Sequence, residues 1–419
     1  MSSHVRWRSR FAVLLAALAS GLPAAAVLAD PAPTYRALLE QAQASAPRLA
    51  EAKSDVARFE GLARQAAARP NPTLGLEFEN FSGTGPFRGT DLAETTAQLE
   101  QALELGGKRP ARMAAGRADV DAARARSTQA RADFAFDLAD AYAQAEAAER
   151  RAQLALDAVA LAEEDARVAN ALVKAGKEAD LRAVQARAAV QAARAAHDEA
   201  RAANAAAFGK LTALAGSPRP LTAIVASLLD HADRSEKIPQ PDPLAAPGYL
   251  AAQAAREAAA RRVRVERTRG VPDVAVSLGL RRLNGDDSTA MVGGVSAPLP
   301  LFDRNRGNVS AAQAELAGAE ARLNAARLDA EADTRSATAR ALAAHSRIAA
   351  ARESEQAADE AYRLTRIGYQ GGKLSLAELN IARRALTEAR AQTLDARLER
   401  LSAEAMLARL QGVAPFGDL

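Results

Sequence analysis

Residues 173–181 read Val-Lys-Ala-Gly-Lys-Glu-Ala-Asp-Leu, and residues 369–379 read Tyr-Gln-Gly-Gly-Lys-Leu-Ser-Leu-Ala-Glu-Leu. Both stretches interrupt long segments of helical character, and the Ala-Gly-Lys at 175–177 recurs 196 residues later as the Gly-Gly-Lys at 371–373. Glycine permits a tight reversal between two antiparallel helices. Each stretch therefore predicts the tip of a helical hairpin, and the spacing suggests a duplicated chain.

Other landmarks recur in the same order along the chain. They are Ala46-Pro47 with Ala246-Pro247, Pro72 with Pro272, and 211–216 with 407–412. Each half therefore predicts a helix, two extended segments, a long helix, a turn and a returning helix. We expect a signal peptide at 1–29, a first repeat at 30–216, a proline-rich and mostly irregular linker or equatorial segment at 217–245, a second repeat at 246–414 and a tail at 415–419.

The two helical hairpins are expected at 110–215 and 307–412. No proline occurs between residues 111 and 174, and Gly116 is the one glycine there. At 1.5 Å per residue, such a helix would reach roughly 95 Å. A helix of this length cannot fold back on a compact core, so it must pack against partners in a coiled coil or a tube.

Four extended segments alternate between apolar and polar residues, as transmembrane β-strands do. We expect them at about 72–82, 93–105, 273–283 and 290–302. Leu74, Leu76 and Phe78 would share one face of the first strand, with acidic residues on the other face. Amphipathic hairpins packed on the helices would give the same pattern. If the strands do span a membrane, four of them cannot close a barrel, whereas three copies would supply twelve.

Four acidic residues are expected on the polar face of the strands: Glu77, Glu79, Glu100 and Glu104. In a closed barrel they would face the lumen and concentrate cations by their electric field rather than by coordination. The alternative is that they are simply the solvated lining of an aqueous pore.

The first 29 residues have the features of a cleaved export signal. Arg6, Arg8 and Arg10 precede a short apolar run at 11–22, and small residues near Ala29 place the cleavage before Asp30. Removal of this segment lowers the formal charge from +4 to about +1, with acids and bases interspersed, which does not favour nucleic-acid binding. The chain has no cysteine, so neither a disulfide nor a lipid anchor through cysteine is expected.

No catalytic, cofactor or metal site is expected from the residues. The mature chain has three histidines, His197, His231 and His345, which are isolated in sequence. None of them belongs to a cluster with the spacing of metal ligands. An enzyme is therefore the least favoured interpretation.

Two motifs resemble a known family. Residues 101–109 (Gln-Ala-Leu-Glu-Leu-Gly-Gly-Lys-Arg) and 295–308 (Val-Ser-Ala-Pro-Leu-Pro-Leu-Phe-Asp-Arg-Asn-Arg-Gly-Asn) resemble strand-to-helix passages of the CzcC-like branch of TolC-type outer-membrane factors. The resemblance covers the mature chain and implies a mainly α fold with β-hairpins: a long α-helical barrel plus four transmembrane β-strands per chain. It further implies a homotrimer in outer-membrane lipid, with a twelve-stranded barrel above a periplasmic tunnel. Such a trimer would dock to a periplasmic adaptor and a resistance-nodulation-division pump that exports metal cations.

The same resemblance assigns adaptor docking and a gate to the helical tips. The residues concerned are Gly176, Lys177, Asp180, Gly371, Gly372, Lys373, Ser375 and Glu378. Ser375 is also expected to cap the returning helix. Glu378 matches the first of two aspartates that form an acidic constriction in TolC, but Ile381 stands at the second position, so at most one acidic ring is implied. Alternatively, Glu378 pairs with a neighbouring arginine.

Three other functions fit a chain of this shape. The protein could be an outer-membrane duct for drugs, a duct for type I protein secretion, or a periplasmic coiled-coil scaffold. An adaptor would carry a lipoyl-like β-module between its helical arms, and the sequence shows none.

Overall fold

A computed structural model describes residues 30–234, 238–371 and 373–416, so the expected signal peptide lies outside the described residues. The helices are α1 (Tyr35–Ser45), α2 (Pro47–Ala67), α3 (Lys108–Lys174), α4 (Asp180–Ala215), α5 (Pro247–Arg269), α6 (Arg306–Gln370) and α7 (Leu376–Gln411). The strands are β1 (Asp30–Ala32), β2 (Thr73–Glu79), β3 (Glu94–Leu103), β4 (Leu221–Ile224), β5 (Val274–Leu283) and β6 (Ser288–Ser296). Among the helices within these ranges, none has the length and apolar character needed to pass through a bilayer.

The two halves of the chain repeat one order of elements. The series α2, β2, β3, α3, α4 is followed, after a middle segment, by α5, β5, β6, α6, α7. The long helices α3 and α6 have 67 and 65 residues, and the returning helices α4 and α7 have 36 each. At 1.5 Å per residue, α3 and α6 are about 100 Å long. The duplication predicted from the sequence landmarks is confirmed.

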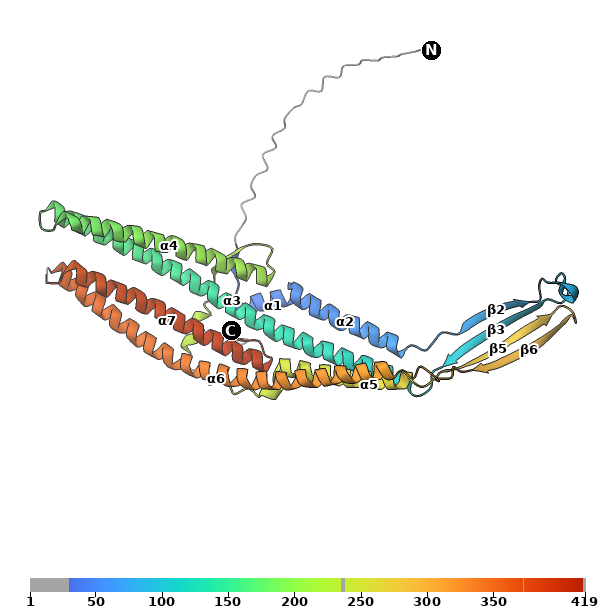
Figure 1. Ribbon diagram of the computed structural model, residues 1–419. Helices are drawn as coiled ribbons and strands as arrows, with labels where there is room; N and C mark the ends of the chain where they lie inside the picture. Colours follow the sequence, from blue (N-terminus) through green and yellow to red (C-terminus); the bar gives the residue numbers. More distant parts are fainter. Residues whose placement is uncertain (1–29, 235–237, 372, 417–419) are drawn as a thin grey trace, which may run out of the picture.

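The helices form a single curved layer rather than a bundle around a core. Figure 1 shows the sheet at one end of an elongated molecule and the two helical tips at the other. Near the sheet, α2, α3, α5 and α6 lie side by side, and near the tips the order is α4, α3, α7 and α6. The end of α4 lies beside the end of α1, where Gly216 faces Ser45, just before α2 begins. The end of α7 lies beside the start of α5, where Gly412 faces Pro247. The shorter helices therefore stack end to end in pairs, while α3 and α6 run the whole length.

Small side chains let neighbouring helices approach closely in this layer. Most buried residues of α3 are alanines. At Gly116, an added Cβ would lie 3.1 Å from the Cα of Ala63 on α2. The alanine-rich composition thus produces a thin, closely packed wall.

The sheet has the order β2-β3-β5-β6, and every pair is antiparallel. The register places Leu74, Leu99 and Leu278 side by side, and Glu100 between Thr73 and Ser277. Apolar residues therefore share one face and polar residues the other, as the alternation predicted. β2 and β6 each pair on one side only in this chain, so both outer edges of the sheet are open.

The fourth strand is shorter than the predicted 290–302, and its prolines explain why. Asn284 N–H donates to the carbonyl of Ala93 at 3.0 Å. The backbone N–H and C=O groups of even-numbered residues in β5 therefore point toward β3, and those of odd-numbered residues point toward β6. In the register of the pair, the odd-numbered residues of β5 lie opposite even-numbered residues of β6, so the even-numbered residues of β6 form the bonds to β5. Ser296 is the last even residue that can donate, because Pro298 and Pro300 have no N–H. The ladder consequently ends at Ser296.

The middle segment at 217–245 is more ordered than the proline content predicted. It contains β4, which pairs in parallel with β1, and a short 3-10 helix at Leu229–Asp233. The carboxylate of Glu146 on α3 is 2% exposed and accepts hydrogen bonds from the N–H groups of Leu228 and Leu229 at 2.7 and 3.0 Å. This buried carboxylate attaches the segment to the middle of the helical layer.

The largest buried cluster lies at the same level. Tyr35 packs edge-on against Tyr142 and Phe416, each with ring centroids 6.0 Å apart. The tail expected at 415–419 is thus packed at Phe416, and residues 417–419 lie outside the described ranges.

Candidate functional site

Both helical hairpins end in the same turn. The N–H of Lys177 donates to the carbonyl of Leu172 at 2.9 Å, and the N–H of Lys373 donates to the carbonyl of Gly368 at 2.8 Å. A bond across this span is typical of a helix that ends at a glycine with positive φ, and Gly176 has a φ of 68°. The corresponding Gly372 lies outside the described residues. Gly176 therefore makes the tight reversal at the first tip, and the bond from Lys373 spans the same number of residues at the second.

The two returning helices begin differently. Ser375 caps α7, since its Oγ accepts from the N–H of Glu378 at 3.3 Å and its own N–H donates to Oε2 of Glu378 at 2.7 Å. Hydrogen bonds from the backbone N–H and then the hydroxyl of Ser375 hold the pKa of Glu378 below its usual value. At α4 the capping position is Ala179, which offers no side-chain bond, and the exposed Asp180 follows it. The carboxylate of Glu378 is thus occupied by the cap rather than by an arginine.

A cavity of about 570 Å³ lies between the two tips. It is lined by Leu161, Val168 and Lys177 from the first hairpin and by Tyr369, Ser375 and Leu379 from the second, among others. Of the predicted tip residues, Lys177 and Ser375 line this cavity, whereas Asp180 and Glu378 lie outside its lining.

An ion pair between Asp165 on α3 and Arg383 on α7 borders the cavity and joins the two hairpins. The side chains of Asp165 and Arg383 are 22% and 14% exposed. Burial raises the pKa of Asp165, and the charge of Arg383 opposes this shift. Nearby, the buried hydroxyl of Tyr369 has no hydrogen-bond partner among the described residues, and burial followed by the charges of Asp165 and Glu178 raises its pKa.

Sequence reasoning did not single out Asp165 or Arg383. Each occupies an ordinary position on a long amphipathic helix, where charged residues are usually solvated. A usable signal exists, because Asp165 precedes Gly176 by 11 residues and Arg383 follows the corresponding Gly372 by 11. Equal distances from the two tips place the residues at one level of the layer.

The polar face of the sheet carries fewer free acids than predicted. Glu77 and Glu100 are exposed and form no ion pair with any described residue. Glu79 instead pairs with Arg281 at 3.1 Å, and Arg281 also contacts Glu94 at 3.1 Å. Two of the face's acids are therefore neutralised by one arginine from the second half of the chain.

The strand predicted at about 93–105 ends before Glu104, whose assignment to the lumen stays a prediction. β3 ends at Leu103, and the carboxylate of Glu104 turns to Arg112 on α3, with a second contact of 3.1 Å. Next to it, Asp273 accepts from the N–H of Leu105 at 3.2 Å and pairs with Lys108 at 2.8 Å. These bonds close the strand-to-helix passage, so Glu104 stabilises the joint.

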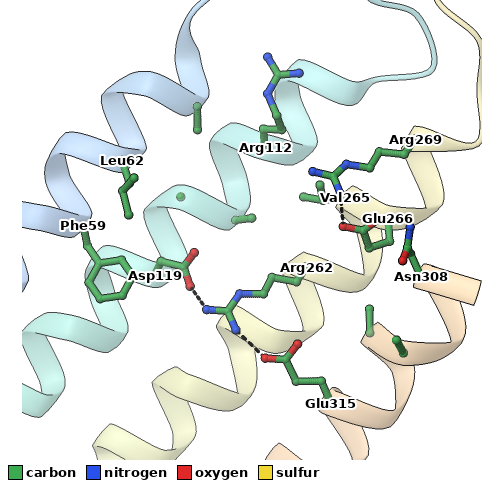
Figure 2. Close-up of a pocket in the computed structure, with 15 residues that line it drawn as sticks. Phe59, Leu62, Arg112, Asp119, Arg262, Val265, Glu266, Arg269, Asn308 and Glu315 are labelled. Atoms are coloured by element: carbon green, nitrogen blue, oxygen red, sulfur yellow. Dashed lines mark hydrogen bonds and ion pairs between the residues drawn. The ribbon is translucent and has the colours of Figure 1, made fainter. Parts of the chain in front are cut away.

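One surface of the helical layer carries a groove near the sheet, and the charges that line this groove are balanced. A cavity of about 540 Å³ crosses α2, α3, α5 and α6 just below the sheet. Figure 2 shows Arg262 between Asp119 and Glu315, at 2.7 Å from each, and Glu266 paired with Arg269. Arg112 lines the same cavity, so three arginines face three carboxylates there.

The described part of the chain contains no group of three or more His, Cys, Asp or Glu side chains placed to hold a metal ion. His197 lies on α4, His231 in the middle segment and His345 on α6, far apart along the layer.

Comparison with known proteins confirms the family that the two motifs suggested. A sequence model of the outer membrane efflux protein family matches residues 38–217 and 246–413, which are the two repeats without the middle segment. The chain belongs to this family of outer membrane efflux proteins.

Its relatives include metal-resistance proteins. The nickel and cobalt resistance protein CnrC of Cupriavidus metallidurans is 44% identical over 300 residues, which cover 71% of each protein. The nickel-cobalt-cadmium resistance protein NccC of Alcaligenes xylosoxydans xylosoxydans is 40% identical, covering 70% of this chain and 67% of NccC. The fold matches that of the outer membrane protein VceC of Vibrio cholerae with a TM-score of 0.73 and 22% identity, covering 91% of this chain and 96% of VceC.

Proposed function

We propose that three copies of this chain form a passive duct through the outer membrane that exports heavy-metal cations, with nickel and cobalt as the first candidates. The cargo is inferred from the 44% identity to CnrC, which is named as a nickel and cobalt resistance protein. The chain itself would catalyse nothing. It would conduct what a periplasmic adaptor and an inner-membrane resistance-nodulation-division pump deliver.

The open edges of the sheet support the trimer. β2 and β6 each leave one row of backbone N–H and C=O groups unpaired within the chain. In hydrocarbon each unsatisfied group is costly, so a spanning sheet must close on itself. Pairing β6 of one copy with β2 of the next closes twelve strands with three copies. The helical layer would close in the same operation, because its outer helices α2, α4 and α6 are also partnered on one side only.

The division of the sheet into one apolar and one polar face supports a polar lumen. The face with Leu74, Leu99 and Leu278 would meet lipid, and the face with Glu77 and Glu100 would line the pore. Exposed carboxylates in a narrow pore raise the local cation concentration without binding any one ion tightly. Selection of the metal would then belong to the pump.

We assign adaptor docking and gating to the tips. The turn residues Gly176, Lys177, Gly371 and Lys373 form the end of the molecule farthest from the sheet. The capped start of α7 at Ser375 and the start of α4 at Asp180 frame them. The signal peptide at 1–29 would bring the chain to the periplasm before insertion.

Deletion of the gene and measurement of metal tolerance test the cargo. We expect lowered tolerance to nickel, cobalt or cadmium with unchanged tolerance to organic drugs, restored by the wild-type gene. Sensitivity to drugs alone, or loss of a secreted protein, would instead support the drug-efflux or type I secretion alternatives. Membrane fractionation tests the duct itself, because recovery as a soluble periplasmic monomer would indicate a scaffold and refute the channel.

A further inference from the structure

The helical layer has two distinguishable surfaces just below the sheet. One surface is the groove lined by Arg112, Asp119 and Arg262. Glu104, which follows β3 in line with Glu100, reaches Arg112 on that surface. The polar face of the sheet therefore continues into the groove, and the apolar face of the sheet continues into the opposite surface.

Five arginines lie on that opposite surface, close to the sheet. They are Arg64 on α2, Arg117 on α3, Arg264 and Arg267 on α5, and Arg306 on α6. At 100° per residue, each lies roughly 150–170° around its helix from the centre of the groove-lining residues. All five are exposed, and none forms an ion pair with a described residue. We call these five residues the arginine band.

Three of the glutamates near the arginine band are paired with other arginines. Glu60 pairs with Arg124 at 2.8 Å, and Glu257 pairs with Arg261 at 2.7 Å. Glu266 pairs with Arg269 at 2.7 Å on the groove side. Asp121, four residues after Arg117, and Asp303, three residues before Arg306, are exposed and form no ion pair with a described residue. With five arginines and these two acids, the band carries an excess of positive charge, in contrast to the balanced groove behind it.

The height of the band matches a membrane surface. Arg64, Arg264, Arg267 and Arg306 lie within five residues of the helix ends that meet the sheet, which is about 8 Å along the axis. Arg117 lies lower, at about 14 Å. The polar headgroup region on each side of a bilayer is about 5–8 Å thick. Four of the five arginines would therefore face headgroups if the apolar strands occupy the hydrocarbon, and Arg117 would lie just beyond them.

Apolar side chains lie between the band and the strands. The loop from β6 to α6 exposes Leu299, Leu301 and Phe302, the last at 98%. Apolar anchors next to cationic side chains are typical of a surface that sits at a lipid interface.

We propose that the arginine band binds the phosphate groups of phospholipids in the periplasmic leaflet of the outer membrane, with a preference for anionic lipid. The guanidinium group matches phosphate in a two-pronged geometry, which favours arginine over a simple point charge. A trimer would carry the band around its whole circumference and so fix the height of the duct in the bilayer. This inference rests on the proposed function, because it requires the apolar face of the sheet to lie in lipid.

Lipid binding by the purified full-length trimer in an uncharged detergent tests the proposal. Phosphatidylglycerol is added, and bound lipid is counted by native mass spectrometry while thermal unfolding is followed. The band variant combines Arg64→Gln, Arg264→Gln, Arg267→Gln and Arg306→Gln. The matched control removes four exposed, unpaired arginines far from the sheet: Arg187→Gln, Arg201→Gln, Arg322→Gln and Arg340→Gln.

We expect wild type and control to bind phosphatidylglycerol alike, and the band variant to lose on the order of tenfold in apparent affinity. Phosphatidylcholine should bind more weakly to all three. Unchanged binding by the band variant would overturn the proposal, as would equal stabilisation by inorganic phosphate, which would indicate a general anion site. Loss of the trimer in the band variant alone would assign the arginines to contacts between copies, which also overturns it.

Different results would refute the proposed duct and the proposed lipid binding by the arginine band. A wild-type protein that neither forms a trimer nor conducts in a planar bilayer would refute the duct itself. A conducting trimer whose lipid binding is unaffected in the band variant would refute only the role of the arginines.

Discussion

Asp165 on α3 and Arg383 on α7 form an ion pair that joins the two helical hairpins of one chain next to the tip cavity. Arg383→Gln would leave a mostly buried carboxylate without its partner, at a cost of about 3 kcal/mol in the free energy of unfolding. We expect a lower unfolding temperature and, because we assign the gate of the duct to the tips, a higher conductance in planar bilayers. Adding Asp165→Asn should restore much of the stability.

The matched control is Arg363→Gln, which removes an arginine from the exposed pair with Glu360 on α6. Both side chains of that pair are more than half exposed, so the change should be small. An equal loss of stability in both variants would contradict a special role for the Asp165 pair.

The start of α7 should loosen in acid. The pKa of Glu378 is lowered in the folded chain by the hydrogen bonds from Ser375. A lowered pKa means that the folded state holds fewer protons, so the stabilisation is present above the unfolded value and is lost as pH falls through the folded value. Hydrogen exchange of the first-turn amides of α7 should therefore differ between wild type and Glu378→Ala at neutral pH, and the difference should vanish well below pH 4.5. A difference that persists in acid would show that the carboxylate charge is not involved.

Local patterns in the sequence predicted much of the fold for a physical reason. The Gly-Lys turns and the period-two strands are decided by neighbours in sequence, and Ser375 carries its capping partner three residues away. The end of β6 at Ser296 was not predicted, because the effect of Pro298 and Pro300 depends on which residues of β6 donate hydrogen bonds to β5.

Contacts between distant residues were not accessible in this way. The pairing of Leu99 with Leu278 joins the two repeats, and no local pattern specifies which strand of one half meets which strand of the other. Glu104 was predicted to lie within the strand because it continues the alternation of β3, but β3 ends at Leu103 and an arginine one helical turn into α3 pairs with its carboxylate. The Asp165–Arg383 pair and the Glu146 site likewise depend on how helices stack.

Glu146 should be essential for attaching the middle segment. Its carboxylate accepts from the N–H groups of Leu228 and Leu229 and from the hydroxyl of Ser227. Glu146→Ala would leave these donors buried without an acceptor, at a cost of about 3 kcal/mol in unfolding free energy. Thermal unfolding and limited proteolysis should show early release of 221–234. Glu353→Ala, at an exposed helical glutamate without an ion pair, should change stability by less than about 0.5 kcal/mol.

Gly279 in β5 should not tolerate a side chain. A Cβ at this position would lie 2.4 Å from the carbonyl oxygen of Ala97 and 2.8 Å from the Cα of Gln98, so the backbone of β3 would have to move. We expect Gly279→Ala to destabilise the sheet by at least about 1–3 kcal/mol and to lower the yield of folded trimer. At Gly293 the nearest atom would be 3.6 Å away, so Gly293→Ala is the matched control and should fold normally. Equal yields for the two variants would contradict the observed register.

Glu77 and Glu100 should set the ionic preference of the duct, because they are the predicted lumen acids that remain exposed and unpaired. Replacing both by glutamine should lower the ratio of cation to anion permeability on the order of twofold, measured as a shift of the reversal potential in a potassium chloride gradient. The shift should shrink in 1 M salt, where the Debye length falls to about 3 Å. The control pair Glu51→Gln and Glu353→Gln removes the same charge from exposed helical positions and should leave the reversal potential unchanged. If the strand variant keeps wild-type selectivity while the trimer conducts, the acids merely solvate the pore wall.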